Sequence, residues 1–386
     1  MGADKLSFFE FFAGGGMARA GLGSHSWQCL FANDFDHKKS GVYADNWGRE
    51  SLVCGDVAKL NISQLPGSPR LVWASFPCQD LSLAGGGAGL KGDRSGTFWP
   101  FWRLMDALIA DGRAPDIIAL ENVCGTLTSH GGKDFAAICN ALVKSGYRFG
   151  AVVIDAALFV PHSRPRLFVI AVREGLAIPK RLIGDGASAQ WHPKALRTVY
   201  DQLPACAKDR WLWWRLAPPV LSNMRFADLI EENPQSVAWH TPEQSAKLLS
   251  MMSTVNLAKV NHAKRSRLKM VGTVYKRTRF DADGNKVQRA EVRFDDIAGC
   301  LRTPAGGSSR QLILVVDGNR VKSRLISSRE TARLMGLPDT YALPENYNEA
   351  YHLTGDGVVV PVVRHLADQI FEPVLFAASQ RLRAVA

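Results

Sequence analysis

Two side chains of complementary chemistry, a thiol and a carboxylate, each follow a short apolar run of the sequence. Cys78 comes shortly after the run Leu71–Ala74, and Glu121 directly follows Asp116–Leu120. If both runs are strands of a parallel sheet, they end at the same edge, where ligands bind in such folds. A deprotonated cysteine is a nucleophile, and a carboxyl group beside it can move a proton. Either residue alone is more often structural, but together they favour covalent chemistry on one bound ligand.

The segments around these residues alternate between apolar runs and amphipathic stretches up to about residue 175. Such alternation predicts a mostly parallel sheet with helices on both faces, a Rossmann-like α/β domain. The predicted strands cover residues 6–12, 29–33, 71–74, 116–120, 152–154 and 167–172. The predicted helices begin at Met17, cover residues 38–46, and place Phe135, Ile138 and Leu142 on one face. Cys78 and Glu121 therefore follow the third and fourth strands.

The alternation stops near residue 179, and the chain then becomes richer in Trp, Arg and Lys. Residues 271–280 and 287–294 flank Asp283-Gly284 and predict a β-hairpin. Helical periodicity returns at about residue 327, and residues 358–363 predict a strand with a helix after it. We therefore expect a first domain at residues 1–178, a smaller, irregular, β-containing domain at 179–322, and a segment at 323–386 that returns to the first.

The composition, with 46% hydrophobic and 22% charged residues among 386, is that of a globular protein and excludes a largely disordered chain. No apolar run approaches the roughly 18 residues that a membrane span needs, and the N-terminus lacks the apolar core of a signal peptide. The seven cysteines are scattered without a CxxC pair, which argues against a zinc site or a disulfide framework. We therefore expect a soluble, intracellular protein without a metal.

The formal net charge of +11 is concentrated in one part of the chain. Between residues 256 and 333, 18 Lys and Arg stand against 7 Asp and Glu, so the remainder is near neutral. A basic excess within a fifth of the sequence favours a polyanionic partner, most simply a nucleic acid. A solvated basic face without a partner is the alternative.

A glycine-rich segment, Phe12-Ala13-Gly14-Gly15-Gly16, directly follows the first predicted strand and opens a helix. Glycines at this place let a ligand approach the backbone and the helix N-terminus closely. Asp34 lies 18 residues beyond Gly16, at the end of the second strand, where it could bind both ribose hydroxyls. Asp56 ends the next segment and could bind an adenine amino group. The pattern predicts an adenosine pocket for either a nicotinamide cofactor or S-adenosylmethionine; helix caps and turn carboxylates are the alternative.

The order of these motifs resembles that of the DNA cytosine-5 methyltransferases over most of the chain. The matching segments are Phe12–Gly16, Asn33-Asp34-Phe35-Asp36, Gly55-Asp56-Val57, Phe76-Pro77-Cys78-Gln79, Asp93–Phe98, Glu121-Asn122-Val123, Arg164-Pro165-Arg166, Arg329-Glu330 through Gly336-Leu337-Pro338, and Gly355-Asp356-Gly357-Val358. Only about 180–295 lacks such matches, and in the family that stretch is the variable target-recognition region. The resemblance implies a methyltransferase domain with a target-recognition domain at 179–322.

The resemblance also implies a reaction and roles for its residues. Cys78 would add to C6 of a cytosine that is flipped out of double-stranded DNA, which activates C5 toward the methyl donor. Glu121 would bond N3 and the exocyclic amine, Asn122 would hold the neighbouring loop, and Arg166 would bond the base from another side. Arg164 belongs to the same motif and is included in the predicted catalytic set. The base that removes the C5 proton is not identified.

The implied methyl donor is S-adenosylmethionine, with S-adenosylhomocysteine as product. By resemblance, Phe35 would stack on adenine, Asp34 and Asp56 would bind ribose and adenine, and Phe98 would close the pocket. The full predicted cofactor-binding set is Phe12, Gly14, Gly16, Asp34, Phe35, Asp56, Val57, Pro77, Phe98 and Asp356.

Three positions depart from the family pattern. Met17 stands where most members have a further glycine, and Asp34 stands where most have Glu, which shortens the reach by one methylene. Asp356 replaces the usual asparagine. An anion there could strengthen binding of the sulfonium, or it could merely cap a turn, and we favour the turn.

Basic runs within residues 264–279 fit phosphate contacts, which position an enzyme on DNA without reading its sequence. The predicted DNA-binding residues are Lys264, Arg265, Arg267, Lys276, Arg277, Arg279 and Arg302. One or two of Arg277, Arg279, Arg289 and Arg293 are expected to reach guanine edges. Strand alternation places Arg277 and Arg279 on one face of the hairpin. Trp211, Trp213 and Trp214 could stack on bases, but we interpret them as core residues.

Rival functions are a tRNA cytosine-5 methyltransferase of the same family, a nicotinamide-dependent oxidoreductase, and a catalytically inactive DNA-binding relative. The basic excess within residues 256–333 favours duplex DNA over tRNA. An oxidoreductase function would give Cys78, Glu121 and this basic segment no role. We expect a monomeric, cytoplasmic enzyme, encoded by a bacterium or phage, whose partner is double-stranded DNA. A cognate restriction endonuclease acting separately is the further partner considered.

Overall fold

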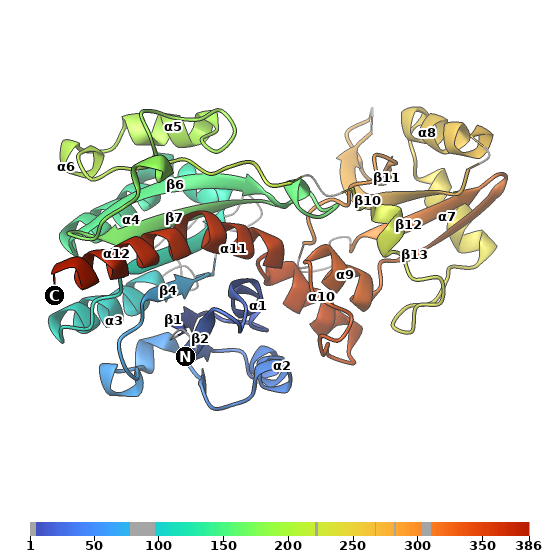
Figure 1. Ribbon diagram of the computed structural model, residues 1–386. Coiled ribbons are helices and arrows are strands. Elements are labelled where there is room, and N and C mark those ends of the chain that lie inside the picture. Colours follow the sequence, from blue (N-terminus) through green and yellow to red (C-terminus); the bar gives the residue numbers. More distant parts are fainter. Residues whose placement is uncertain are drawn as a thin grey trace. The chain divides into compact units, whose positions relative to one another are not determined.

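The chain forms two compact units in the computed structural model, which describes residues 5–77, 97–220, 223–266, 268–281, 283–302 and 310–385 (Figure 1). Unit 1 comprises Met1–Asp155, Pro165–Pro219 and Val360–Ala386, and unit 2 comprises Ala156–Arg164 and Val220–Val359. Cys78, Arg267 and the segment Asp93–Gly96 lie outside the described residues.

Unit 1 is built on a seven-stranded sheet in the order β3-β2-β1-β4-β5-β7-β6. Its strands are β1 (Leu6–Phe11), β2 (Trp27–Asp34), β3 (Leu52–Cys54), β4 (Leu71–Ala74), β5 (Ile117–Val123), β6 (Tyr147–Asp155) and β7 (Pro165–Arg173). Only β7 runs against its neighbours, while β1 to β5 pair in parallel. The predicted α/β class and mostly parallel sheet are confirmed, and the carboxyl ends of β1, β2, β4 and β5 share one edge.

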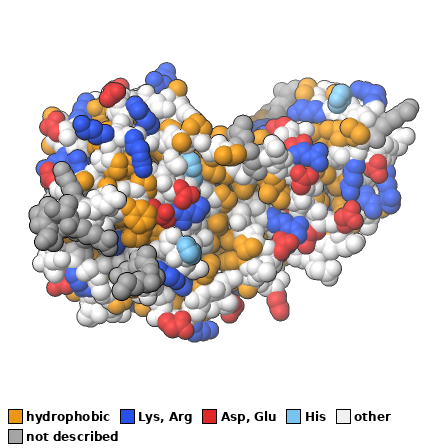
Figure 2. All heavy atoms as spheres, viewed as in Figure 1, with side chains coloured by type: hydrophobic (Ala, Val, Ile, Leu, Met, Phe, Trp, Pro, Cys, Tyr) orange, Lys and Arg blue, Asp and Glu red, His pale blue; other side chains and the backbone are white. Residues whose placement is uncertain are grey.

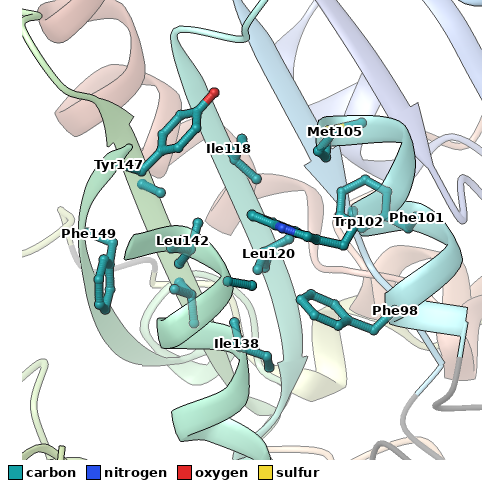
Figure 3. Close-up of a cluster of buried hydrophobic side chains, with 14 of the residues drawn as sticks. Phe98, Phe101, Trp102, Met105, Ile118, Leu120, Ile138, Leu142, Tyr147 and Phe149 are labelled. Atoms are coloured by element: carbon teal, nitrogen blue, oxygen red, sulfur yellow. The ribbon is translucent and has the colours of Figure 1, made fainter. Parts of the chain in front are cut away.

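Helices cover both faces of this sheet (Figure 1). They are α1 (Met17–Leu22), α2 (His37–Trp47), α3 (Phe98–Ala110), α4 (Lys133–Lys144), α5 (Lys194–Asp201), α6 (Ala205–Lys208), α11 (Val360–Leu366) and α12 (Glu372–Val385). On one face, Phe98 and Trp102 of α3 meet Ile138 and Leu142 of α4 over Leu120 of β5 (Figure 3). Alternate strand residues face the other layer, where Trp73 contacts Phe371. The buried strands read as continuous apolar runs because both of their faces are covered.

Residues 179–219 pack in unit 1, so the unit does not end at the expected boundary of residue 178. The cause is a group of buried tryptophans. Trp211 packs edge-on against Phe149 of β6 at 5.6 Å between ring centroids, and the indole of Trp214 donates to the Ile170 carbonyl of β7 at 3.2 Å. Strand β9 (Trp213–Trp214) pairs with β8 (Ile183–Gly184). The interpretation of these tryptophans as core residues is confirmed.

Unit 2 contains a four-stranded antiparallel sheet in the order β11-β10-β12-β13. Its elements are α7 (Pro242–Ser250), α8 (Thr254–Arg265), β10 (Met270–Phe280), β11 (Lys286–Arg293), β12 (Leu312–Asp317), β13 (Arg320–Leu325), α9 (Ser328–Leu334) and α10 (Tyr347–Asp356). The predicted hairpin is confirmed as β10 and β11. Residues 323–359 belong here rather than with unit 1, because Arg324 and Glu330 form a fully buried ion pair within this unit.

The strand predicted at residues 358–363 is wrong, because this stretch begins helix α11. Val359, Val362, Val363 and Leu366 are all buried, at spacings of three and four residues that fit one helical face. Pro361 lies in the first turn, where its missing N–H costs nothing. Helix α11 packs on α1 at Gly21, where an added Cβ would come within 2.5 Å of the Val363 Cβ.

No helix in the described ranges is long and apolar enough to cross a membrane. The same part of the chain contains no cluster of His, Cys, Asp and Glu suited to a metal ion.

Candidate active site

The glycine-rich loop after β1 is fixed to the end of β2 by two short hydrogen bonds. Phe12 and Gly16 adopt left-handed backbone angles, with φ of 57° and 78°, and the first of these is uncommon for a residue with a side chain. The Ala13 N–H donates to the Asn33 carbonyl at 2.9 Å, and the Gly14 N–H donates to Asp34 Oδ2 at 2.7 Å. The loop is therefore held in one conformation by the strand that carries the predicted ribose ligand.

Asp34 is a buried carboxylate, and its desolvation raises its pKa. Its second oxygen accepts the N–H of Asp36 at 2.8 Å. Because each carboxylate oxygen has about two lone pairs, one on each oxygen is still available to a hydroxyl. Phe35 beside it is 75% exposed. A large apolar ring in water at a strand end is what a site for stacking a flat heterocycle requires.

Asp56 caps a short helix, since its Oδ1 accepts the Ala58 N–H at 2.9 Å, while Val57 is buried. This contact is that of a turn carboxylate, the alternative weighed for the sequence, and it leaves the adenine contact of Asp56 a prediction. Phe98 is fully buried against Phe76, with ring centroids 5.3 Å apart. Phe98 thus belongs to the core beneath the end of β4.

Trp47, the last residue of α2, supports the glycine loop, a role that the sequence analysis missed. Its indole N–H donates to the Gly15 carbonyl at 3.0 Å. A Cβ on Gly16 would lie 2.4 Å from the Trp47 indole nitrogen and 2.9 Å from a Tyr43 ring carbon, so only glycine fits. The Arg19 guanidinium lies 5.3 Å from the Trp47 ring centroid and donates to the Tyr43 hydroxyl at 2.9 Å. The available signal was the i, i+4 spacing of two aromatic residues on one helix.

We expect Trp47→Phe to weaken binding of S-adenosylhomocysteine by about 3- to 10-fold, because the ring stays while one hydrogen bond to the loop, worth about 0.5–1.5 kcal/mol, is lost. Isothermal titration calorimetry measures the change. Trp27→Phe is the matched control: it removes an indole bond of 2.8 Å to Glu372, away from the loop. Equal affinity for both variants would show that Trp47 has no such role.

Glu10 is a second missed residue, a carboxyl group within the apolar strand β1. It is 1% exposed, and its Oε1 accepts the backbone N–H of Arg19, in the first turn of α1, at 3.4 Å. Burial raises its pKa to about 8, so the group is mostly protonated at neutral pH. The signal in the sequence is a single acid inside the run 6–12, two residues before the glycine motif.

Glu10→Gln is expected to remove a pH dependence of stability. The folded-state pKa of about 8 lies above that of the unfolded chain, so the folded state binds more protons between about pH 5 and pH 8. Folding stability from this group is therefore greatest at low pH and falls as the pH rises through 8, by roughly 2–4 kcal/mol. Urea unfolding at pH 6 and pH 9 measures the loss, and an equal loss in the Gln variant would refute this account.

The ends of β4 and β5 are joined by Asn122. Its side-chain amide donates to the Phe76 carbonyl at 3.2 Å, two residues before Cys78 in the sequence. Its oxygen accepts the Val123 N–H at 2.8 Å and the Thr126 hydroxyl at 3.2 Å. Every polar group of this side chain thus bonds the backbone at the carboxyl-end edge of the sheet, which is the role expected of a positioning residue.

Glu121 and Arg166 form an ion pair at the same edge. The Arg166 Nε lies 3.3 Å from Glu121 Oε1, and the Glu121 side chain is nearly buried. Strands β5 and β7 are antiparallel and set Val123 opposite Arg166, which places the two charged groups together. Cys124 follows in the chain, and burial raises the pKa of its thiol even though Arg166 acts in the opposite direction. Cys124 is therefore held as a neutral thiol and is a poor candidate nucleophile.

The comparisons with known proteins agree with this geometry. Residues 6–372 match the family of C-5 cytosine-specific DNA methylases. The chain belongs to this family. It is 25% identical over 380 residues to Type II methyltransferase M.BsuFI of Bacillus subtilis, covering 98% of this chain and 76% of that protein. It is 24% identical over 369 residues to Type II methyltransferase M.HhaI of Haemophilus parahaemolyticus, covering 95% and 94%.

Solved structures share the fold at low sequence identity. Dnmt2 methyltransferase of S. pombe matches with a TM-score of 0.58 and 17% identity, covering 96% of this chain and 99% of that one. A putative DNA modification methyltransferase encoded within a prophage of E. coli matches with a TM-score of 0.59 and 17% identity, covering 97% and 100%. The resemblance to cytosine-5 methyltransferases is thus confirmed, the protein is an enzyme of that class, and the oxidoreductase alternative is excluded.

Arg164 of this methylase does not have the contacts of a group that touches a substrate. It is buried in unit 2, where it donates to the Gly355 carbonyl at 2.7 Å and the Gly357 carbonyl at 2.8 Å, and to Leu301 at 3.3 Å. These contacts are those of a positioning residue that holds the turn around Asp356. The sequence motif grouped Arg164 with Arg166, but Arg164 precedes β7 and belongs to unit 2, whereas Arg166 lies on β7 in unit 1.

Asp356 is the exposed last residue of α10. A carboxylate at a helix C-terminus is opposed by the helix dipole and cannot donate to the last carbonyl groups. The two interpretations of Asp356, cofactor binding and turn capping, both stay predictions.

The predicted DNA-binding residues that the structure describes all lie in unit 2. Lys264 and Arg265 end α8, Lys276, Arg277 and Arg279 lie on β10, and Arg302 follows β11. Arg277 and Arg279 do share one face, as predicted, because both bind Glu291. On the face shown in Figure 2, Lys and Arg side chains of this unit are interspersed with Asp and Glu.

Proposed function

We propose that this methylase transfers a methyl group from S-adenosylmethionine to C5 of a flipped-out cytosine in a specific double-stranded DNA sequence, through a covalent bond between Cys78 and C6. The observation that carries the proposal is the Glu121–Arg166 pair, at the sheet edge where Asn122 fixes the backbone leading to Cys78. The Gly14 loop and Asp34 lie along the same edge, at the ends of strands two and three places away from β5.

Catalysis begins with the thiolate of Cys78 adding to C6 of the base. At pH 7 only a few per cent of an unperturbed cysteine is thiolate, so the addition needs a second group that makes C6 of the ring more electrophilic. Glu121 supplies it by holding a proton at N3, which draws electrons away from C6. Arg166, at 3.3 Å, keeps this carboxyl group oriented and offers N–H groups to the base. Electron density then accumulates at C5.

The bound S-adenosylmethionine supplies an electrophilic methyl group. Asp34 offers a free lone pair on each oxygen to the ribose hydroxyls, and the exposed Phe35 offers a ring face to adenine. The left-handed Gly16 and the Trp47 contact keep the loop close-packed, so that a ligand meets the backbone rather than side chains there. Loss of the C5 proton and expulsion of Cys78 restore the aromatic ring.

A base inside a duplex is beyond the reach of this site, so extrusion at a cost of a few kcal/mol precedes the chemistry. We assign methyl transfer to unit 1 and target recognition to unit 2, with double-stranded DNA as the partner. We further propose that the enzyme is monomeric and cytoplasmic. Its further partner is a cognate restriction endonuclease, which acts separately and has a related DNA sequence specificity.

The test is methylation of duplex DNA and of tRNA side by side with the purified protein, followed by sequencing that locates 5-methylcytosine. Methyl groups on C5 of cytosine within one DNA sequence are the expected result. Modification confined to tRNA would favour the rival substrate, and no transfer to either nucleic acid would overturn the proposal.

A further inference from the structure

Strands β10 and β11 extend beyond the sheet of unit 2 as a two-stranded ribbon. Strand β10 pairs with β12 only along Met270–Val274, but with β11 along Thr273–Phe280. Residues 275–280 and 286–291, hereafter the ribbon, pair with each other beyond the part of β10 that pairs with β12 (Figure 1). At its base, the buried Ala290 donates its N–H to the Met251 carbonyl at 3.0 Å, which fixes this end of β11 to unit 2. A two-stranded hairpin is marginally stable alone in water, so its projection calls for a physical reason.

The ribbon is exposed on both faces towards its tip. Arg277, Thr278 and Arg279 are exposed on β10, as are Gln288 and Arg289 on β11. Phe280 is 68% exposed, an unusual position for a large aromatic ring. The ribbon's basic residues are Lys276, Arg277, Arg279, Lys286 and Arg289, whereas Glu291 is its acid. This surface suits a polyanion that can contact it from more than one side.

Glu291 orients two of these arginines. Its Oε2 lies 3.2 Å from the Arg277 Nε, and its Oε1 accepts the Arg279 Nε at 2.9 Å and a terminal nitrogen at 2.5 Å. Tyr275, opposite Glu291 in register, lies with its ring centroid 6.0 Å from the Arg277 guanidinium. The Tyr275 hydroxyl donates to the Cys300 carbonyl at 3.0 Å, which anchors this end of the ribbon.

Arg293 is set apart from this group. It pairs with Asp295 through both Nε and a terminal nitrogen, and it stands opposite Thr273, where β10 is also paired with β12. Of the four arginines considered from the sequence, it is therefore the one that lies in the three-stranded part of the sheet, outside the ribbon. Arg289 stands opposite Arg277 and shares its face.

We propose that the ribbon enters the major groove of the DNA substrate, that Arg277 and Arg279 read guanine there, and that Glu291 is their positioning residue. The major groove is about 12 Å wide and admits a two-stranded ribbon, and the arginine fork bonds guanine O6 and N7 in a bidentate manner. Glu291 holds Arg277 through Nε, and Arg279 through Nε and one terminal nitrogen, which limits the rotamers lost on binding. This assignment rests on the proposed function, because it requires a duplex DNA substrate.

The test compares the full-length enzyme with single variants on a library of duplexes, scored by the sequences around each new 5-methylcytosine. R277A and R279A are each expected to relax the preference at one guanine by about 5- to 100-fold. E291Q is expected to relax both positions, because it frees both forks. K286A, on the opposite face of the ribbon, is the control: it should weaken binding equally for all sequences and reduce the salt slope of log K by about one.

Three outcomes separate the possibilities. No methylation of DNA by the unmodified enzyme would overturn the proposed function and this assignment with it. Methylation by every variant with an unchanged sequence profile would overturn the assignment alone. If Glu291 merely stabilised the ribbon, E291Q would lower the thermal midpoint without changing the profile, and that result would remove its positioning role.

Discussion

Cys78→Ser is expected to lower the rate of methyl transfer by at least about 10³-fold while leaving binding of DNA and of S-adenosylhomocysteine in place. A serine hydroxyl is far less acidic than a thiol and is almost wholly un-ionised at pH 7, so addition to C6 loses its nucleophile. The change alters the side-chain volume little. Single-turnover transfer of a labelled methyl group to duplex DNA measures the effect.

Cys206→Ser is the matched control for this experiment, since it removes an exposed thiol from α6 of the same unit. A second measurement uses duplex DNA with 5-fluorocytosine at the target, where the blocked loss of the C5 substituent should trap the enzyme as a covalent adduct on a denaturing gel. Full activity of Cys78→Ser, or no adduct with the unmodified enzyme, would rule out the covalent mechanism.

Glu121→Gln is expected to reduce kcat by about 10²- to 10⁴-fold, the usual contribution of a positioned acid. The amide can still bond the base, but it cannot hold or release the proton at N3. It also leaves Arg166 without its counter-charge at 3.3 Å. The measurement is kcat and KM on duplex DNA, together with cofactor affinity, which should change little because Asp34 and the glycine loop are untouched.

Glu174→Gln provides a control of the same chemistry. Glu174 is exposed and pairs with Arg210, so the variant removes one charge from an ion pair away from the catalytic edge. It should keep kcat within about twofold, because surface ion pairs contribute little. If Glu121→Gln also stayed within that range, Glu121 would not be the acid, and the role of the Glu121–Arg166 pair would have to be reassigned.

Much of unit 1 could be predicted from sequence, because its strands are buried on both faces and read as unbroken apolar runs. The run 71–74 coincides with β4, and the helical face of Phe135, Ile138 and Leu142 is buried in α4. The glycine motif and the residues at strand ends followed directly, since parallel strands bring their carboxyl ends to one edge. What the contacts at this edge do chemically stays a prediction.

The remainder depended on tertiary contacts that no local pattern contains. The apolar run at 358–363 fits a strand or a buried helix equally well, and only its packing on α1 at Gly21 decides for α11. Trp211 and Phe149 are far apart in the sequence, so no local pattern near residue 178 could show that they share a core. Glu10 and Trp47 likewise gain their roles from a loop that folds back on them.

The return of the chain to unit 1 at residue 360 has a consequence for synthesis on the ribosome. Trp27 bonds Glu372, Gly21 packs on Val363, and Trp73 contacts Phe371, so one face of the unit 1 sheet lacks part of its cover until these late residues emerge. A polypeptide truncated before them would expose that apolar face and invite aggregation or proteolysis. Unit 1, which carries Glu121, therefore cannot be completed before unit 2 has been made, and an interrupted translation product does not yield a complete unit 1.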